Sequence, residues 1–145
     1  MICGIDPGVT GGIAFYNGLE LYAHRVPTSK LANKKILDME GICKLLVQYE
    51  PDMVFIEQQQ AMPRQGVAST FKTGFGYGVY IGILHALGYS YTVVIPRKWK
   101  SDLAVPSDKD MARQRATDLM PMGESSWFRK CEDGVAEASL IAYWG

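Results

Sequence analysis

The sequence has little cysteine, little histidine and no excess of either charge. Its three cysteines, Cys3, Cys43 and Cys131, lie far apart and form no CxxC pair. Neither a zinc ribbon nor a disulfide framework is therefore indicated, and we expect reduced, mostly buried thiols in a cytoplasmic protein. Fifteen Lys and Arg balance fifteen Asp and Glu. This balance excludes a highly charged nucleic-acid coat and a polybasic membrane tail, but it leaves room for a local basic patch.

Long apolar runs are also missing. The longest apolar region, residues 77–87, is interrupted by two glycines and a histidine, and it is too short to cross a bilayer. The first residues carry no basic segment ahead of an apolar one, so no signal peptide and no membrane association are expected. A length of 145 residues suits one domain over residues 1–145, which can bury a core without disulfides.

The apolar segments of the first 26 residues alternate with turn residues. Asn17-Gly18 is a strong hairpin signal, and we predict a three-stranded antiparallel meander around it. The apolar run at residues 53–56 is typical of a central strand that is buried on both faces. The predicted strands are residues 2–5, 11–16, 19–26, 53–56 and 91–95.

Four segments have helical periodicity or composition. The second of these segments, residues 70–87, is predicted to be a glycine-rich buried helix, in which Gly74, Gly78 and Gly82 recur every four residues. Their smooth face suits packing against the sheet or a dimer interface. Hairpin strands followed by strand–helix alternation predict an α/β fold, with a mixed sheet and helices on both faces. The predicted helices are residues 38–49, 70–87, 108–119 and 132–143.

Two predicted strands end in an acidic residue. Asp6 follows the first strand and Glu57 follows the fourth. Burying an isolated carboxylate at the end of an apolar strand costs free energy, so stability alone does not explain these acids. Asp6-Pro7-Gly8 could simply form a turn, but glutamate is a poor turn residue and Glu57 has no such explanation. Ligands gather at strand ends in open sheets. The two acids therefore indicate a binding site.

A third acidic site lies on the last predicted helix. Asp133 and Glu137 are four residues apart and share one helix face, although an acid in the first turn also suits the helix dipole. No histidine or cysteine spacing suits zinc, so three acidic sites favour Mg²⁺ or Mn²⁺ held by oxygen ligands. Four carboxylates can bridge two such ions for phosphodiester cleavage.

Three motifs resemble those of the RuvC-type Holliday junction resolvases of the ribonuclease H-like superfamily. They are ICGIDPG at residues 2–8, VFIEQ at 54–58 and DGVAEA at 133–138. MPRQG at 62–66 and PRKWK at 96–100 look most like the small resolvases carried by bacteriophages. The resemblance spans nearly the whole chain. It implies one RuvC-like nuclease domain, 1–145, with a ribonuclease H-like five-stranded sheet of three antiparallel and then parallel strands, and helices on both faces.

The resemblance assigns a role to each acid. Asp6 would bridge two metal ions and Glu57 would hold one of them. Asp133 and Glu137 would complete the site from the last helix. The bacterial enzymes usually place their last two acids three residues apart, a register that puts Gly134 where an acid is expected. Glu132 is therefore an alternative to Asp133.

The resemblance also implies two catalytic lysines near the scissile phosphate, which we assign to Lys100 and Lys109. Lys98 competes with Lys100 for the first role. Met62 or Phe71 could wedge between bases, although Phe71 also suits a core position that anchors the helix. The residues expected to contact DNA are Met62, Arg64, Phe71, Lys72, Lys98, Lys100 and Lys109.

The activity implied by the resemblance is that of a crossover junction endodeoxyribonuclease, acting in DNA recombination and repair. It would cut four-way junctions, and other branched DNA, to 5′-phosphate and 3′-hydroxyl ends with two Mg²⁺ or Mn²⁺ ions per active site. A symmetric substrate needs two sites, so we expect a homodimer. The expected location is the cytoplasm, that of a bacterial host if the protein is phage-encoded.

Two other hypotheses stay open at this point. One is a catalytically silent branched-DNA-binding module, although acids that face DNA phosphate would not help a pure binder. The other is a phosphate-binding fold of the sugar-kinase and actin type, which needs a second copy of its core and for which 145 residues are too few.

Overall fold

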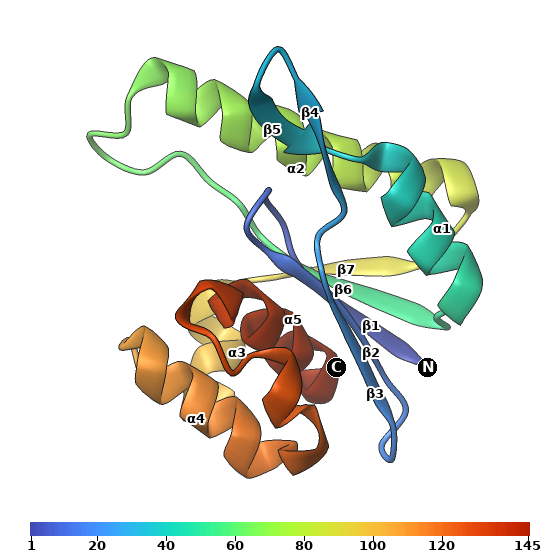
Figure 1. The fold of residues 1–145 in the computed structure, drawn as a ribbon, viewed down its shortest axis with the longest axis vertical. Helices are drawn as coiled ribbons and strands as arrows, with labels where there is room; N and C mark the ends of the chain where they lie inside the picture. The colour runs from blue at the N-terminus through green and yellow to red at the C-terminus, as the bar shows by residue number, and fades with distance from the viewer.

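A computed structural model describes all 145 residues, and its centre is a mixed five-stranded sheet (Figure 1). The strand order is β3-β2-β1-β6-β7. The first three strands pair antiparallel, and β6 and β7 run parallel to β1. The strands are β1 (Ile2–Asp6), β2 (Gly12–Tyr16), β3 (Leu21–Arg25), β6 (Met53–Glu57) and β7 (Tyr91–Val94).

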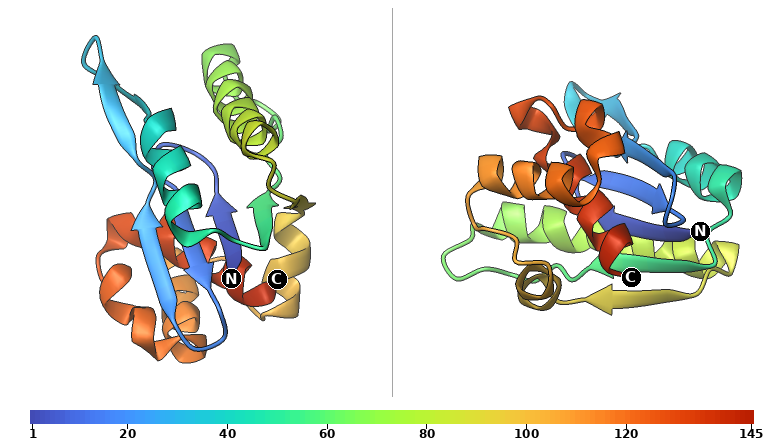
Figure 2. Two further views of the ribbon diagram at one scale, coloured as in Figure 1. Left: turned by 90° about the vertical axis from the view of Figure 1, so that its right-hand side faces the viewer. Right: turned by 90° about the horizontal axis from the view of Figure 1, so that it is seen from below.

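Helices cover both faces of this sheet (Figure 2). On one face, α1 (Met39–Tyr49) and the C-terminal half of α2 (Val67–Leu87) bury a core with residues such as Ile5, Leu46 and Leu84. On the other face lies α5 (Asp133–Trp144), in a core with Trp99, Trp127 and Leu140. The remaining helices are α3 (Pro96–Asp102), α4 (Lys109–Leu119), η1 (Pro121–Ser126) and η2 (Lys130–Glu132).

The predicted fold class is confirmed. The meander, the parallel strands and the four predicted helices are present within a few residues of the expected bounds, and Asp38 caps α1 by accepting a hydrogen bond from Gly41 N. All three cysteines are unpaired, but the expectation of mostly buried thiols is wrong: Cys3 is buried, Cys43 is half-buried and Cys131 is exposed. No helix combines the length and apolar character needed to cross a membrane.

The prediction that the second helix is buried is wrong. Only Tyr80, Ile83 and Leu84 of α2 are buried. The helix has 21 residues and is therefore about 31 Å long, which exceeds the five-residue strands beneath it, and its N-terminal half extends past the sheet (Figure 1). A Cβ atom built on Gly74, Gly78 or Gly82 would meet no other heavy atom within 4 Å, so these glycines do not pack against the sheet.

Two elements were not predicted. The segment expected as a basic loop is α3, which starts at Pro96 and buries Trp99 completely. A second sheet is formed by the hairpin of β4 (Thr28–Leu31) and β5 (Lys34–Leu37), whose polar sequence does not alternate clearly.

Helix α5 lies unusually close to β1 and β2. A Cβ atom on Gly4 would overlap the carbonyl oxygen of Ala138 and the backbone of Ala142, and one on Gly12 would come within 2.6 Å of Val135 Cα. The two glycines therefore let the backbone of the helix rest on the backbone of the strands. This contact fixes where the side chains of the first turns of α5 lie relative to the end of β1.

The substitution Gly4→Ala tests this close approach. We expect it to lower the free energy of unfolding by about 1–3 kcal/mol, because the added methyl group has no space. Gly76→Ala on α2 is the matched control, because a Cβ atom there would meet only Leu37 Cδ1, at an ordinary 3.6 Å. It should leave stability unchanged or raise it by up to about 1 kcal/mol, since alanine favours a helix interior. Equal effects of the two substitutions in urea denaturation would contradict the packing described here.

Candidate metal centre

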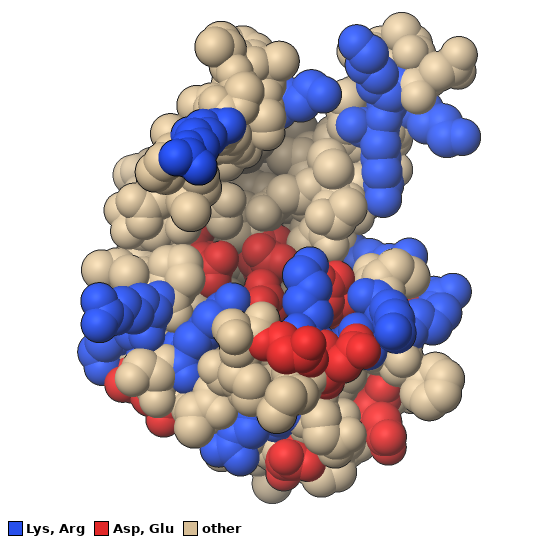
Figure 3. Space-filling model, turned by 90° about the vertical axis from the view of Figure 1, so that its left-hand side faces the viewer, with Lys and Arg blue, Asp and Glu red and all other residues tan.

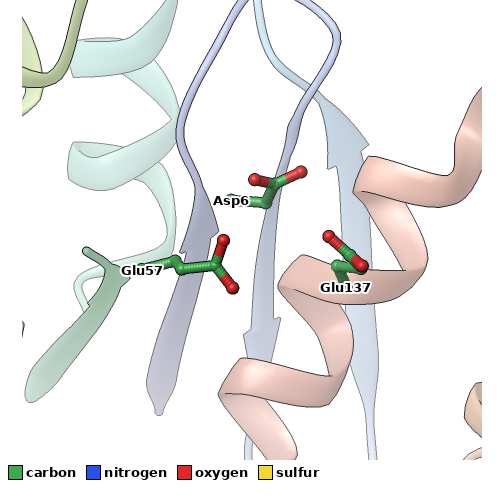
Figure 4. Close-up of side chains that lie close together, drawn as sticks. All are labelled: Asp6, Glu57 and Glu137. Atoms are coloured by element: carbon green, nitrogen blue, oxygen red, sulfur yellow. The ribbon is translucent and has the colours of Figure 1, made fainter. Parts of the chain in front are cut away.

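Three carboxylates converge at the edge of the sheet (Figure 4). Asp6 ends β1, Glu57 ends β6, and Glu137 lies on the second turn of α5. Strands β1 and β6 are parallel neighbours with Ile5 opposite Ile56, so their last residues lie level with each other. One oxygen from each carboxylate lies within 4.8 Å of the other two, close enough to share a metal ion.

The surroundings of these acids oppose their ionisation. Burial raises the pKa of Asp6 well above its usual range, and the negative charges of Glu137 and Glu57 raise it further. Burial and Glu137 also raise the pKa of Glu57, whose side chain is only 7% exposed. Lys100 lowers both pKa values but does not offset the burial. A bound cation would relieve this repulsion. The all-oxygen donor set fits a hard divalent ion such as Mg²⁺ or Mn²⁺.

Helix α3 supplies two donors to the cluster. The buried Trp99 donates from its indole Nε1 to Glu57 Oε2 at 2.9 Å, and Lys100 donates from Nζ to Glu137 Oε1 at 2.7 Å. Lys98 lies elsewhere: it pairs with Asp102 at 2.5 Å. Of the two competing lysines, the structure therefore brings Lys100 to the acids and leaves Lys98 apart from them.

Asp133 lies beside the triad and forms an ion pair with Lys109. Its charge contributes to the raised pKa of Asp6, which places it next to the same space. At Gly134, by contrast, a Cβ atom would come within 2.9 Å of Asp6 Oδ2 and 2.6 Å of Gly11 Cα. The family's usual register, with an acid at position 134, therefore does not fit this backbone. Asp133 and Lys109 line a shared pocket with Asp6 and Glu137.

Glu132, the alternative to Asp133, is held by other partners. Its carboxylate accepts from Arg25 at 3.0 Å and from Arg129 at 2.7 Å. It also accepts from the backbone N–H of Arg129 at 2.9 Å. The hydrogen bonds and charge of Arg129 lower the pKa of Glu132. Glu132 thus holds the segment before α5 in place through these hydrogen bonds, and it does not join the acidic triad.

The remaining DNA-contact candidates lie at the start of α2 and in the loop before it. Met62 and Phe71 are 64% and 73% exposed, and Phe71 stacks on Phe75 with 6.4 Å between ring centroids. The expectation that Phe71 anchors the helix in the core is therefore wrong. Arg64 and Lys72 are also exposed. Figure 3 shows acidic side chains at the bottom of a cleft whose rims carry Lys and Arg on both sides.

Sequence analysis missed Trp99, and it also missed Thr10 and Cys131, which line the pocket with Asp6 and Asp133. Trp99 is the one that bonds to an acid of the triad. Its role depends on α3, which turns the indole inward while the neighbouring lysines stay accessible. The only signal available in the sequence is a lone aromatic residue inside a basic segment. That signal is equally typical of a surface aromatic that stacks on a base.

No family model matches the chain. The chloroplast Holliday junction resolvase MOC1 of Chlamydomonas reinhardtii is 27% identical over 92 residues, which cover 62% of this chain. The matched segment spans only 10% of the length of the algal protein.

Solved structures cover almost the whole chain. RuvC of T. thermophilus bound to a Holliday junction substrate matches with a TM-score of 0.64 and 18% identity, over 99% of this chain and 90% of that one. The yeast mitochondrial Holliday junction resolvase Ydc2 matches with a TM-score of 0.60 and 14% identity, over 99% and 77%. Fowlpox virus resolvase in complex with Holliday junction DNA matches with a TM-score of 0.52 and 14% identity. The match covers 99% of this chain and 96% of that one.

The fold is therefore the one that RuvC and the other Holliday junction resolvases in these comparisons adopt, so the resemblance noted in the sequence is confirmed at the level of the fold. The more specific similarity to phage resolvases stays a prediction.

Removing one charge from the triad should stabilise the metal-free protein. Because the pKa of Asp6 is higher in the folded chain than in the unfolded one, the fold loses stability as pH rises through the folded pKa. We expect Asp6→Asn to raise the Tm at pH 7 by about 3 °C, or roughly 1 kcal/mol for a chain of this size. The same variant should lose the Tm increase that wild type gains with Mg²⁺ or Mn²⁺.

Asp52 gives the control of opposite sign for thermal unfolding. The N-terminal ammonium lowers the pKa of this exposed carboxyl, so Asp52→Asn should not raise the Tm. A metal-free Asp6→Asn protein that melts at or below the wild-type temperature would contradict the repulsion described for the triad.

The Trp99 hydrogen bond gives a separate prediction. Trp99→Phe keeps an aromatic ring in the core but removes the donor to Glu57 Oε2. We expect Mn²⁺ affinity, measured by calorimetry, to fall about 10-fold, since partners that orient a metal ligand contribute about 10–100-fold. Trp127→Phe is the control, because that indole donates to Thr117 instead. Equal losses of Mn²⁺ affinity in both variants would exclude a specific role for Trp99.

Proposed function

We propose that this chain is a metal-dependent, structure-selective DNA endonuclease of the RuvC type, formed by one domain over residues 1–145, that resolves four-way junctions. The observation that carries the proposal is the convergence of Asp6, Glu57 and Glu137 from three separate elements. Their repulsion and burial weaken the metal-free fold, so stability alone does not account for the arrangement. The algal relative and the structural neighbours, which are Holliday junction resolvases, support the same choice.

Asp6, Glu57 and Glu137 would hold the metal, and Asp133 would complete the ligand set. We propose two Mg²⁺ or Mn²⁺ ions per site, which when bound supply a water of lowered pKa and positive charge near the leaving oxygen. Glu57 stays oriented by the Trp99 indole throughout. The products would be 5′-phosphate and 3′-hydroxyl ends.

Two lysines already stand next to these acids. Lys100 pairs with Glu137, and Lys109 pairs with Asp133. In the absence of metal, each lysine ammonium group partly neutralises one carboxylate of the proposed ligand set. With a metal held by these acids, Lys100 and Lys109 would be free to donate to the oxygens of the scissile phosphate and to hold the strand in place.

The exposed start of α2 would contact the DNA beside the cut. Arg64 and Lys72 are exposed basic residues in this part of the chain, and Met62 and Phe71 are exposed apolar side chains that could separate stacked bases at a branch. A branched substrate exposes such base steps more readily than a continuous duplex does. We therefore include other branched DNA among the substrates, within DNA recombination and repair.

Two cuts of like polarity require two sites, so we propose a homodimer. A Cβ atom on Gly74, Gly78 or Gly82 of α2 would have open space around it within the chain. Of the two roles considered for this glycine face, packing against the sheet is excluded, and the dimer interface is the one that we retain. The cytoplasm, of a bacterial host for a phage-encoded protein, stays the proposed location.

A catalytically silent DNA-binding module is the main alternative. Such a module would gain nothing from buried, mutually repelling carboxylates at the bottom of a cleft with basic rims. A sugar-kinase or actin-type fold would need a second copy of the core, and the chain contains one five-stranded sheet of this kind. The endonuclease hypothesis therefore accounts for more of the site.

The experiment compares labelled four-way, three-way, flap and duplex DNA with Mg²⁺ or Mn²⁺. We expect wild type to cut the four-way junction, and Glu57→Gln to bind it normally while cleavage falls at least about 100-fold, since even supporting partners of a metal ligand contribute about 10–100-fold. Glu40→Gln is the matched control, because Glu40 is an exposed residue that pairs with Lys44 on α1.

Two results would sink the nuclease proposal. One is wild-type protein that binds junctions but never nicks them with either ion. The other is a Glu57→Gln protein that cuts as fast as wild type. Binding of duplex and four-way DNA with equal affinity would remove only the selectivity for branched DNA.

A further inference from the structure

The hairpin of β4 and β5 is separate from the main sheet and projects away from it (Figures 1 and 2). Its two central turn residues, Ala32 and Asn33, have φ angles of +47° and +62°. Leu31 pairs with Lys34 on either side of them, which makes the connection a two-residue turn of the type that matches strand twist. The hairpin is thus a defined element, and most of it is exposed.

Its charge is entirely positive. Residues 28–37 contain Lys30, Lys34 and Lys35 and no acidic residue. Lys30 and Lys35 are direct cross-strand partners, so their side chains share one face of the hairpin. None of the ion pairs in the chain involves any of the three lysines.

This pattern opposes the stability of the hairpin itself. A two-stranded hairpin is marginally stable alone, and like charges directly opposite each other weaken it further. Ala32 also occupies a left-handed conformation that alanine rarely adopts. A polyanion outside the chain would offset this repulsion.

The position of the hairpin indicates which polyanion. The hairpin and the N-terminal half of α2 stand on opposite sides of the space above the ends of β1 and β6 (Figure 2). Seen from the open side, Lys and Arg lie on both of these arms, with the acidic side chains between and below them (Figure 3). A strand whose phosphate reaches the triad would continue past both arms.

We propose that residues 28–37 form a second phosphate-binding arm, in which Lys30, Lys34 and Lys35 bind the backbone of a DNA arm on the side of the cleft opposite α2. The inference rests on the proposed function, because it takes the ligand to be the branched DNA that the triad would cut. It adds three lysines outside the motifs that carry the family resemblance. It also explains why the hairpin keeps its repelling charges.

The test is the salt dependence of junction binding. The triple variant Lys30→Gln, Lys34→Gln, Lys35→Gln is compared with its parent by fluorescence anisotropy on a labelled four-way junction. Both carry Glu57→Gln, so that cleavage does not interfere. Each phosphate contact contributes about 0.9 to the slope of log K against log salt. We expect the slope to fall in magnitude by about 2–3 units and the affinity at low salt to fall at least about tenfold.

Two further variants test whether the effect is specific to the hairpin and provide for a triple variant that does not fold. Lys44→Gln removes an exposed lysine of α1, which already pairs with Glu40, and it should leave the slope unchanged. If the triple variant fails to fold, Lys35→Gln alone relieves the repulsion with Lys30 and should lower the slope by about 1 unit.

The outcomes separate the two proposals. An unchanged slope, or a loss of affinity without a change in slope, would overturn the phosphate-binding arm and leave the nuclease proposal in place. A reduced slope in a protein whose wild type never cuts would support the arm and overturn the nuclease. A parent protein that binds no junction at all would also overturn the arm.

Discussion

Repulsion among Asp6, Glu57 and Glu137 is the interaction on which the rest of the structure depends. Three carboxylates lie within reach of one cation in a partly buried space, where each charge disfavours the others. The fold imposes this arrangement through two contacts. The parallel pairing of β1 with β6 aligns two of the acids, and the glycine contact of β1 with α5 brings in the third. The backbone therefore holds together charges that would separate in solution.

The surrounding elements act on this repulsion without removing it. Trp99 fixes the orientation of Glu57, while Lys100 and Lys109 each neutralise one acid. The balanced composition of the chain takes on a meaning here, because divalent ions bound to the acids would make the molecule a net cation. Positive charge on the rims of the cleft would then act together with positive charge at its bottom.

Much of this could be predicted from the sequence, for local reasons. Asn17-Gly18 and the apolar runs around it determine the meander, and an acid after a buried strand signals a site wherever the partner strand is parallel. What depends on tertiary contacts was missed or misjudged. The exposure of Phe71 follows from a helix longer than the sheet beneath it. The choice of Lys100 over Lys98 depends on α3, whose short basic sequence gives no helical pattern. The hairpin of β4 and β5 was missed because its sequence is mostly polar.

The most direct test of the account is crystallographic. Crystals grown with Mn²⁺ should show an anomalous scattering peak between the carboxylates of Asp6, Glu57 and Glu137, with Lys100 displaced from Glu137. The peak should disappear in crystals of Asp6→Asn protein. A wild-type structure in millimolar Mn²⁺ with no peak at the triad, and with Lys100 still bonded to Glu137, would contradict the central claim that these acids are held together to bind a divalent cation.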